Sequence, residues 1–259
     1  MSDEKSMYDQ MWRDWFMTDA FKVEKRIIRF LRLLPHEPRC KFCHAPFEGI
    51  GGVFVRTVFR KQRSGLNPRF CNVCEAFAVK HPGGHEVEMS MLFADVRGST
   101  ALSEQMSSTE FSRLINRFFV ESTNVIVRED GLVEKLAGDA VAAFWGAGFA
   151  GPDYVARTIR AAQNILKVME HQKIPVGIGV HTGVAYFGAM GSVDGLVNIS
   201  AIGEEVNTAA RLASKAAAGE LIVSEKALQQ AHIDGSGLES RSLELKGISE
   251  PVRVRVMRG

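Results

Sequence analysis

Four cysteines in two CxxC pairs constrain this chain more than any other feature of its sequence. The pairs are CKFC at residues 40–43 and CNVC at residues 71–74, and no other cysteine occurs among the 259 residues. Each pair can present two thiolates from a tight turn, and two such turns complete a tetrahedral four-thiolate site. We therefore expect one metal centre, held by Cys40, Cys43, Cys71 and Cys74.

Zn²⁺ is the metal expected at this centre, with an iron-sulfur cluster as the less favoured alternative, because both accept four thiolates. Four histidines lie nearby and could replace a thiolate, although flanking surface histidines are commoner than a mixed site: His36, His44, His81 and His85. The chain starts with MSDEKSMYDQ, which lacks the features of a secretory signal, and no apolar run reaches the roughly 18 residues that span a bilayer. We expect a cytoplasmic protein without membrane spans, whose cysteines stay reduced.

Three regions are expected along the chain. They are an N-terminal amphipathic helical segment at 1–38, the CxxC...CxxC metal-binding module with its linker at 39–85, and a larger domain at 86–259. With 46% hydrophobic and 24% charged residues, the composition is that of an ordinary globular chain, and the net charge of +2 favours no class of partner.

Residues 11–34 predict one amphipathic helix that ends at Pro35. Its apolar face, expected to pack on the protein or on a second copy, contains Trp15, Phe16, Val23, Ile27, Phe30, Leu31 and Leu34. The segment GGVFVRTVFRK at residues 51–61 suggests a hairpin between the cysteine pairs. Basic residues along both segments leave two less favoured alternatives open, binding to a membrane surface and binding to nucleic acid.

From residue 86 onward, strand patterns and helix patterns alternate. We expect a strand ending at Asp95, a helix opened by the capping box of Ser107 and Glu110, and a hairpin that turns at Gly138 and Asp139. Further expected elements are a helix at 152–171, a strand pair at 176–190, a helix from Glu204, the strand LIVS, and a terminal hairpin of SLELKG and PVRVRVM. This order favours an α+β sandwich with an antiparallel or mixed sheet.

Two acids stand at strand ends or turns, Asp95 in MSMLFADVRGST and Asp139 in LAGDAV. Paired carboxylates at such positions can hold two hard divalent cations, which grip a triphosphate. The helix that opens at Ser99 or Thr100 offers free backbone amides to phosphate oxygens. No GxxxxGK[ST] segment is present, so P-loop chemistry is not expected.

The segment SAIGEEVNTAARLAS predicts a helix with a buried stripe of Val206, Ala209, Ala210 and Ala213. Asn207 and Arg211 are four residues apart and share a neighbouring face. In a cleft, asparagine can fix a sugar and arginine can meet charge that develops on a phosphoryl group. A merely solvated helix face is the alternative.

Four segments together resemble the catalytic domain of class III adenylyl cyclases: LFADVRGSTALSE, VEKLAGDAVAAFWG, GIGVHTGVAYFGAMGS and IGEEVNTAARLAS. The resemblance covers about residues 86–259 and implies a ferredoxin-like, palm-type α/β sandwich that converts ATP to cyclic AMP and pyrophosphate with two Mg²⁺ or Mn²⁺ ions. Asp95, Asp139 and the backbone carbonyl of Val96 would then hold these metals, and Asn207 and Arg211 would act on the ribose and on the transition state.

By the same resemblance, Lys135 would select adenine and Lys246 would lie near the terminal phosphates. Ser200 stands where many family members have the aspartate that helps to read adenine, and one branch of the family carries serine or threonine here. A serine hydroxyl can still accept the hydrogen bond of the adenine amino group. Ser99 replaces a phenylalanine that is common in the family. His181 is expected to be structural, on a strand that leads into a turn.

The family forms its sites between two domains, and because this chain carries each set of residues once, we expect a homodimer with two composite sites. The N-terminal module would regulate it. Three alternatives remain: a catalytically weak sensor with a cyclase fold, a module that binds a partner or nucleic acid, and a guanylate or diguanylate cyclase.

Overall fold

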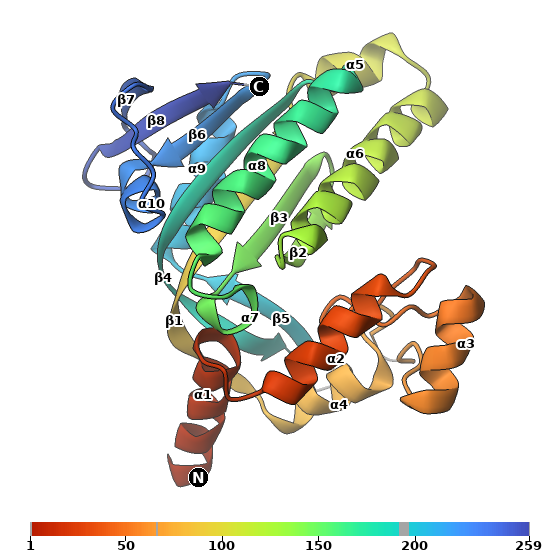
Figure 1. The fold of residues 1–259 in the computed structure, drawn as a ribbon. Helices are drawn as coiled ribbons and strands as arrows, with labels where there is room; N and C mark the ends of the chain where they lie inside the picture. Colours follow the sequence, from red (N-terminus) through yellow and green to blue (C-terminus); the bar gives the residue numbers. More distant parts are fainter. Residues whose placement is uncertain (1, 66, 192–196, 259) are drawn as a thin grey trace. The chain divides into compact units, whose positions relative to one another are not determined.

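The computed structural model describes residues 2–65, 67–191 and 197–258, with side chains from residue 7 onward. Ser192 of the segment GIGVHTGVAYFGAMGS and Gly259, the last residue of the expected catalytic domain, lie outside the described residues. The chain forms two compact units (Figure 1). The first consists of Met1–Val87 and Tyr186–Ala201, and the second of Glu88–Ala185 and Ile202–Gly259.

The first unit contains four helices in its described part: α1 (Ser2–Met17), α2 (Lys22–Leu33), α3 (Gly49–Val58) and α4 (Asn72–Lys80). The prediction of one helix over residues 11–34 was therefore wrong. α1 ends at Met17, and the last helical carbonyl bond is closed by Thr18, whose backbone N–H and hydroxyl both donate to the carbonyl oxygen of Asp14, over 3.2 Å and 2.9 Å. The Thr18 hydroxyl then accepts from the N–H of Ala20, a local bond that competes with the helical pattern.

The hairpin expected at residues 51–61 was also wrong, because α3 occupies most of this segment. Its buried residues are Gly51, Gly52 and Val55, at helical spacing. The absence of a side chain at Gly52 allows close approach to the preceding loop, since a Cβ atom there would lie 2.5 Å from the carbonyl carbon of Phe47. Tertiary packing thus overrides the strand propensity of the β-branched residues.

The chain contains a sheet with the strand order β2-β3-β1-β4-β6-β8-β7, and β5 pairs with β4 beside this path. The strands are β1 (Gly83–Val96), β2 (Leu132–Ala137), β3 (Ala140–Trp145), β4 (Val176–Gly191), β5 (Val197–Ile202), β6 (Glu220–Ser224), β7 (Glu239–Leu243) and β8 (Val252–Arg258). β4 and β6 are parallel, whereas β1 and β2 each pair with β3 in antiparallel fashion. This mixed sheet confirms the α+β fold class.

Both predicted hairpins of the second unit are present, β2 with β3 and β7 with β8, but β7 covers residues 239–243, so most of the predicted strand SLELKG at 242–247 lies in the connection to β8. The strand pair expected at residues 176–190 is instead the single strand β4, which places His181 inside a strand and not before a turn. In the described part of the second unit, six helices accompany these strands: α5 (Ser99–Gln105), α6 (Ser108–Arg128), α7 (Ala147–Ala150), α8 (Tyr154–His171), α9 (Glu204–Lys215) and α10 (Glu225–Gln230). The capping box of Ser107 and Glu110 opens α6 as predicted.

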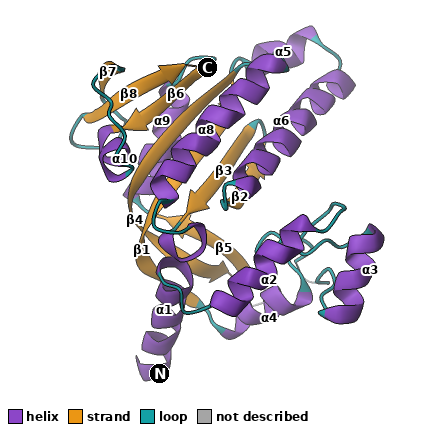
Figure 2. Ribbon diagram, viewed as in Figure 1, coloured by secondary structure: helices purple, strands orange, loops and turns teal. Residues whose placement is uncertain are grey.

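In the second unit, α6 and α8 cover one face of the sheet and α9 lies on the other (Figures 1 and 2). The alternation along β6 explains this layering. Leu221 and Val223 point into the core that contains residues of α6 and α8, whereas Ile222 points into the core that contains Leu212 of α9. Each face of the strand therefore buries apolar residues under its own helices.

Helix α9 packs closely on β4 because both contribute small residues at the contact. A Cβ atom at Gly179 would lie 2.2 Å from the backbone nitrogen of Ala213 and 2.7 Å from the carbonyl oxygen of Ala209. The predicted stripe was partly wrong, because Val206 and Ala210 are only half-buried. The residues that α9 buries are Thr208, Ala209, Leu212 and Ala213. Among the described residues, no helix is long and apolar enough to cross a membrane.

Candidate active site and cysteine cluster

The two predicted metal-binding acids lie side by side. Asp95 pairs with Ala140 across the β1–β3 ladder, and the backbone N–H of Val96 donates to the carbonyl oxygen of Asp139 over 3.0 Å. Strand pairing thus brings together two aspartates that are 44 positions apart in the sequence. Asp95 Oδ1 is buried, and its contact in the described structure is the ion pair with the guanidinium of Arg97. Two neighbouring carboxylates are the oxygen ligands that hard divalent cations prefer.

A nearby cation that the sequence reasoning overlooked is Arg97, whose guanidinium forms an ion pair with Asp95. Its Nη1 donates to the carbonyl oxygen of Ser214 over 3.1 Å. Burial lowers the pKa of Arg97, and the carboxylate of Asp139 acts in the opposite direction. Arg97 therefore supplies positive charge to both acids. The spacing could have revealed it, because residues two apart on an extended chain point the same way.

The other predicted residues near the acids lie on β2 and α5. Ser99 and Thr100 form the first turn of α5, directly after Gly98 in the left-handed conformation. Lys135 is exposed on β2, at the edge of the sheet, and pairs with Ala142 of β3. A register shift between Val133 and Lys135 interrupts the β2–β3 ladder just before the lysine.

The remaining predicted residues of the second unit gather around α9 and the β7–β8 connection. Asn207 is exposed and Arg211 is half-buried one turn later on α9. A Cβ atom at Gly247 would lie 3.5 Å from Arg211 Nη2, so the arginine lies against the segment that carries the exposed Lys246. In the sheet order, β4 and β6 separate the acid-bearing β1 from β8. Ser200 belongs to the first unit, where it is half-buried on β5.

His181 and Glu205 form a buried polar pair that the sequence reasoning also missed. His181 Nε2 lies 2.6 Å from Glu205 Oε2, and His181 Nδ1 lies 2.8 Å from the hydroxyl of Ser224. Lys226 donates to the second oxygen of Glu205 over 3.1 Å. The hydrogen bond to His181, supported by the charge of Lys226, lowers the pKa of Glu205 to about 2. The pair fixes the first turn of α9 against β4 and β6.

The four cysteines converge as predicted, and their ligand atoms all lie within 4.8 Å of one another. All four are buried free thiols, and no described histidine joins the cluster. Turns aim the sulfur atoms inward, because the N–H of His44 donates to the carbonyl oxygen of Cys40 over 2.9 Å and the N–H of Cys71 donates to Cys40 Sγ over 3.2 Å. Four converging sulfurs match the donor set of a zinc or iron-sulfur centre.

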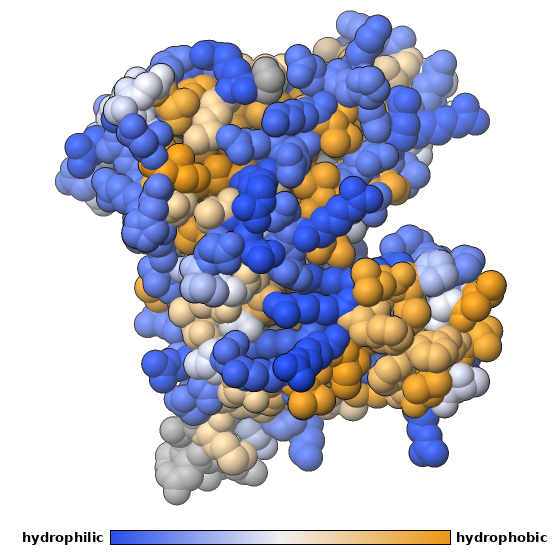
Figure 3. All heavy atoms as spheres, viewed as in Figure 1, coloured by the Kyte–Doolittle hydropathy of each residue, from blue (hydrophilic) through white to orange (hydrophobic). Residues whose placement is uncertain are grey.

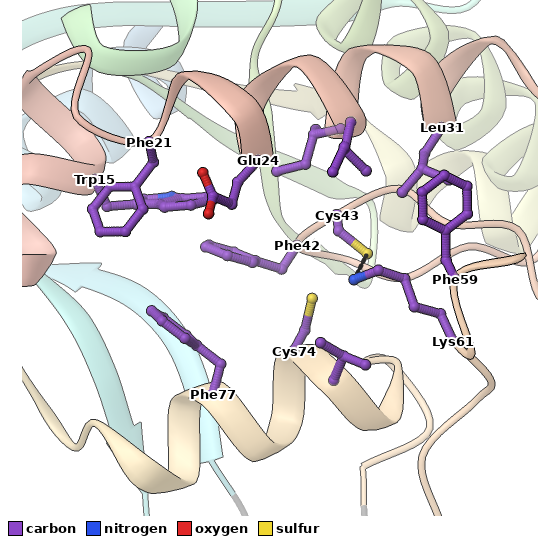
Figure 4. Close-up of a pocket in the computed structure, with 13 residues that line it drawn as sticks. Trp15, Phe21, Glu24, Leu31, Phe42, Cys43, Phe59, Lys61, Cys74 and Phe77 are labelled. Carbon is purple, nitrogen blue, oxygen red and sulfur yellow. Dashed lines mark hydrogen bonds between the residues drawn. The ribbon is translucent and has the colours of Figure 1, made fainter.

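A cavity of about 250 Å³ opens beside this cluster inside the first unit (Figure 4). Aromatic rings of Trp15, Phe42 and Phe77 line one part of it. Cys43 and Cys74 lie at its wall, and Lys61 Nζ donates to Cys43 Sγ over 3.8 Å. The lysine places a positive charge beside sulfurs that carry negative charge when they bind a metal.

Comparisons with known proteins agree with this geometry. The sequence model of the adenylate and guanylate cyclase catalytic domain matches residues 84–254. The chain is 33% identical over 178 residues to the uncharacterized protein Rv1318c of Mycobacterium tuberculosis, a match that covers 66% of this chain and 33% of that relative. This chain thus spans about a third of the length of the relatives it matches in sequence.

Solved structures of similar fold include both substrate classes of nucleotide cyclase. The guanylyl cyclase Cya2 superposes with a TM-score of 0.62 at 25% identity, covering 67% of this chain and 93% of Cya2. The adenylyl cyclase CyaB from P. aeruginosa superposes with a TM-score of 0.60 at 25% identity, covering 67% of this chain and 95% of CyaB. The mixed sheet, the adjacent pair of aspartates and the match to the family model together define a nucleotide cyclase domain. The chain belongs to the adenylate and guanylate cyclase catalytic domain family.

Proposed function

We propose that the protein is an adenylate cyclase that converts ATP to 3′,5′-cyclic AMP and pyrophosphate. The observation that carries this proposal is the juxtaposition of Asp95 and Asp139 by the β1–β3 ladder. Two Mg²⁺ or Mn²⁺ ions bound there would lower the pKa of the ribose 3′ hydroxyl and hold the triphosphate. Asp95, Asp139 and the carbonyl oxygen of Val96 would hold these ions, since the acid pair offers oxygen ligands and its negative charge is met by Arg97 in the described structure.

The residues around α9 would act on the nucleotide itself. Asn207 would orient the ribose, and Arg211, held against the β7–β8 connection, would stabilise negative charge that develops on the α-phosphate. Lys246 would meet the terminal phosphates, as would the backbone amides of the first turn of α5. Lys135 and Ser200 would select adenine, the lysine through its positive charge and the serine through its hydroxyl.

A homodimer would complete the site. The acids stand on β1 and at the turn before β3, whereas Arg211 and Lys246 belong to α9 and the β7–β8 connection, separated from β1 in the sheet order. Each composite site would combine the acids of one protomer with Asn207 and Arg211 of its partner, and the symmetric dimer would hold two such sites. We also propose that the cysteine module, with Zn²⁺ bound, sets the geometry of this dimer and so regulates activity.

Complementation between two inactive variants tests the composite site. Asp95→Ala removes a metal ligand and is expected to abolish cyclic AMP formation, and Arg211→Ala removes the transition-state cation and is expected to reduce it at least about thirtyfold. When the two are mixed and allowed to exchange subunits, random pairing gives mixed dimers with one intact site. Activity should then return to about a quarter of the wild-type level. An inactive mixture whose subunits demonstrably exchange would contradict the composite site.

GTP is the second candidate substrate. The residue at position 200 and the similarity to a solved guanylyl cyclase keep this alternative open. Ser200 is a serine where many family members have an aspartate that reads adenine, and the fold is similar to both a guanylyl and an adenylyl cyclase. Cyclic GMP formed faster than cyclic AMP at equal nucleotide concentration would replace our proposal with this alternative.

A further inference from the structure

An unusually apolar surface covers two helices of the first unit, outside the residues proposed for catalysis. Leu33 of α2 is 82% exposed and Ile50 of α3 is 78% exposed, and further exposed apolar residues lie on the same two helices. Exposed apolar residues that lie together often mark an interaction site. The exposed apolar residues of these helices, called the apolar patch below, are Val23, Phe30, Leu33, Ile50, Val53, Phe54 and Val58.

The apolar patch is continuous from α2 to α3. The ring centroids of Phe30 and Phe54 lie 6.1 Å apart, and that of Phe59 lies 6.4 Å from Phe30. On α3 the buried residues face inward, which leaves Ile50, Val53 and their neighbours one helical turn on to form an outward stripe. Figure 3 shows hydrophobic atoms gathered over α3 beside strongly hydrophilic side chains over α2.

The segment that carries this patch is strongly basic. Residues 20–80 contain thirteen lysines and arginines against four aspartates and glutamates, a surplus of nine positive charges, whereas the rest of the chain has a surplus of seven negative charges. A zinc centre with four thiolates would remove two of the positive charges and leave the module strongly basic. Along α2, the exposed residues Lys22, Arg26 and Arg29 are spaced by four and three positions and so line one face.

We propose that α2 and α3 form a binding surface for an anionic lipid bilayer. On α2, Val23 and Phe30 lie on the face next to Lys22, Arg26 and Arg29, and Leu33 continues the basic line four positions after Arg29. Helices that lie in a bilayer interface likewise combine exposed apolar residues with lysine and arginine. Transfer of aliphatic side chains such as Leu33 and Ile50 from water into lipid is favourable. A surface that binds nucleic acid would instead use basic residues and aromatic rings that stack on bases. Pairing of two apolar patches would bring the lysines and arginines of both α2 helices together, and these repel each other, so a second copy at this face is disfavoured.

Vesicle co-sedimentation of the full chain tests this surface directly. The protein should bind vesicles of equal parts phosphatidylcholine and phosphatidylglycerol, and binding should weaken as salt screens the charges. It should not bind phosphatidylcholine vesicles alone. Leu33→Gln combined with Ile50→Gln should abolish sedimentation. Arg26→Gln combined with Arg56→Gln should weaken binding about thirtyfold, because each basic residue near an anionic bilayer contributes about fivefold.

Matched variants separate this surface from a general loss of fold. Val120 of α6 is 49% exposed, so Val120→Gln makes a similar change elsewhere and should bind the anionic vesicles like the wild type. Cyclase activity in solution should be equal in all these proteins, because none of the changes touches the acid pair, α9 or the four cysteines that are proposed to set the dimer geometry. Vesicle binding that survives Leu33→Gln with Ile50→Gln, or no vesicle binding at all, would overturn the proposal. The proposal would also be overturned if Leu33→Gln with Ile50→Gln left vesicle binding unchanged and only reduced the size of the oligomer, or only weakened binding to DNA.

Discussion

The backbone N–H of Val96 donates to the carbonyl oxygen of Asp139 over 3.0 Å, where β1 ends and β3 begins. This bond locks the end of one strand to the hairpin turn of another, so the two aspartates beside it cannot separate without breaking the sheet. The proposed metal site is thus attached directly to the β1–β3 ladder of the second unit. Such preorganisation is what charge stabilisation in a transition state requires.

Arg97 should act as a stand-in for metal charge in the protein without nucleotide. Replacing it in Arg97→Gln removes the ion pair with Asp95, so we expect the free energy of unfolding to fall by roughly 1.5 to 3 kcal/mol, the value of a hydrogen bond to a charged group. Saturating Mn²⁺ should restore most of the lost stability, because the ion then neutralises the charges of Asp95 and Asp139. Thermal denaturation with and without Mn²⁺ measures both values. An equal loss in both conditions, relative to the exposed control Arg113→Gln, would contradict this role.

Arg211→Ala should reduce kcat while leaving the dimer intact. A preorganised charge stabiliser typically contributes ~2 to 4 kcal/mol to the barrier, which is a decrease of about thirtyfold to a thousandfold. Initial rates of cyclic AMP formation at saturating ATP measure the decrease, and sedimentation velocity measures the dimer. A change confined to KM would show that Arg211 binds the substrate without acting on the transition state.

Glu205 should make stability sensitive to acid. Its pKa of about 2 in the folded chain lies below the ordinary value of 4.5, so the folded state favours the carboxylate. This contribution is fully present above about pH 4.5 and disappears as the pH falls toward 2. Glu205→Gln should therefore be less stable than the wild type at neutral pH and lose less stability across this interval. Denaturant titrations at several pH values test it, with the exposed neighbour Glu204→Gln as control; parallel curves for all three proteins would refute the assignment.

The cysteine cluster should contain one zinc ion per chain by elemental analysis. Cys40→Ser combined with Cys71→Ser should lose this metal and destabilise the first unit, because a structural zinc site contributes directly to folding. The control His85→Ala should keep the metal, since the described cluster consists of cysteines alone. Iron and sulfide in place of zinc would change the identity of the centre. Unchanged dimerisation and activity after loss of the metal would rule out its proposed control of the dimer.

Secondary structure was predicted better for the second unit than for the first, which contains the cysteine module. The reason is that the boundaries in the second unit depend on local residues. In the catalytic unit, the capping box of Ser107 and the turn at Gly138 mark element boundaries whose chemistry does not depend on distant residues. In the module, Val53 and its neighbours have strand propensity, yet the close approach of Gly52 to Phe47 selects a helix. Only the folded structure reveals that contact, because it joins backbone atoms and no side chain signals it.

Partners across the fold were equally hard to predict. Asp95 was predicted to be a metal ligand from its position at a strand end, but its ion pair with Arg97 depends on the geometry after β1. The pairing of His181 with Glu205 requires β4 to continue as one strand and α9 to begin beside it. Long-range pairs of this kind depend on topology, which periodicity does not specify.

Nucleotide turnover by the purified protein tests the central claim most directly. We would measure products from ATP and, separately, from GTP in the presence of Mg²⁺ or Mn²⁺, beside an Asp139→Ala control. The account predicts cyclic AMP from ATP, little cyclic GMP from GTP, and loss of both in the control. A folded dimer that forms no cyclic nucleotide with either metal, or one whose activity survives Asp139→Ala, would contradict it.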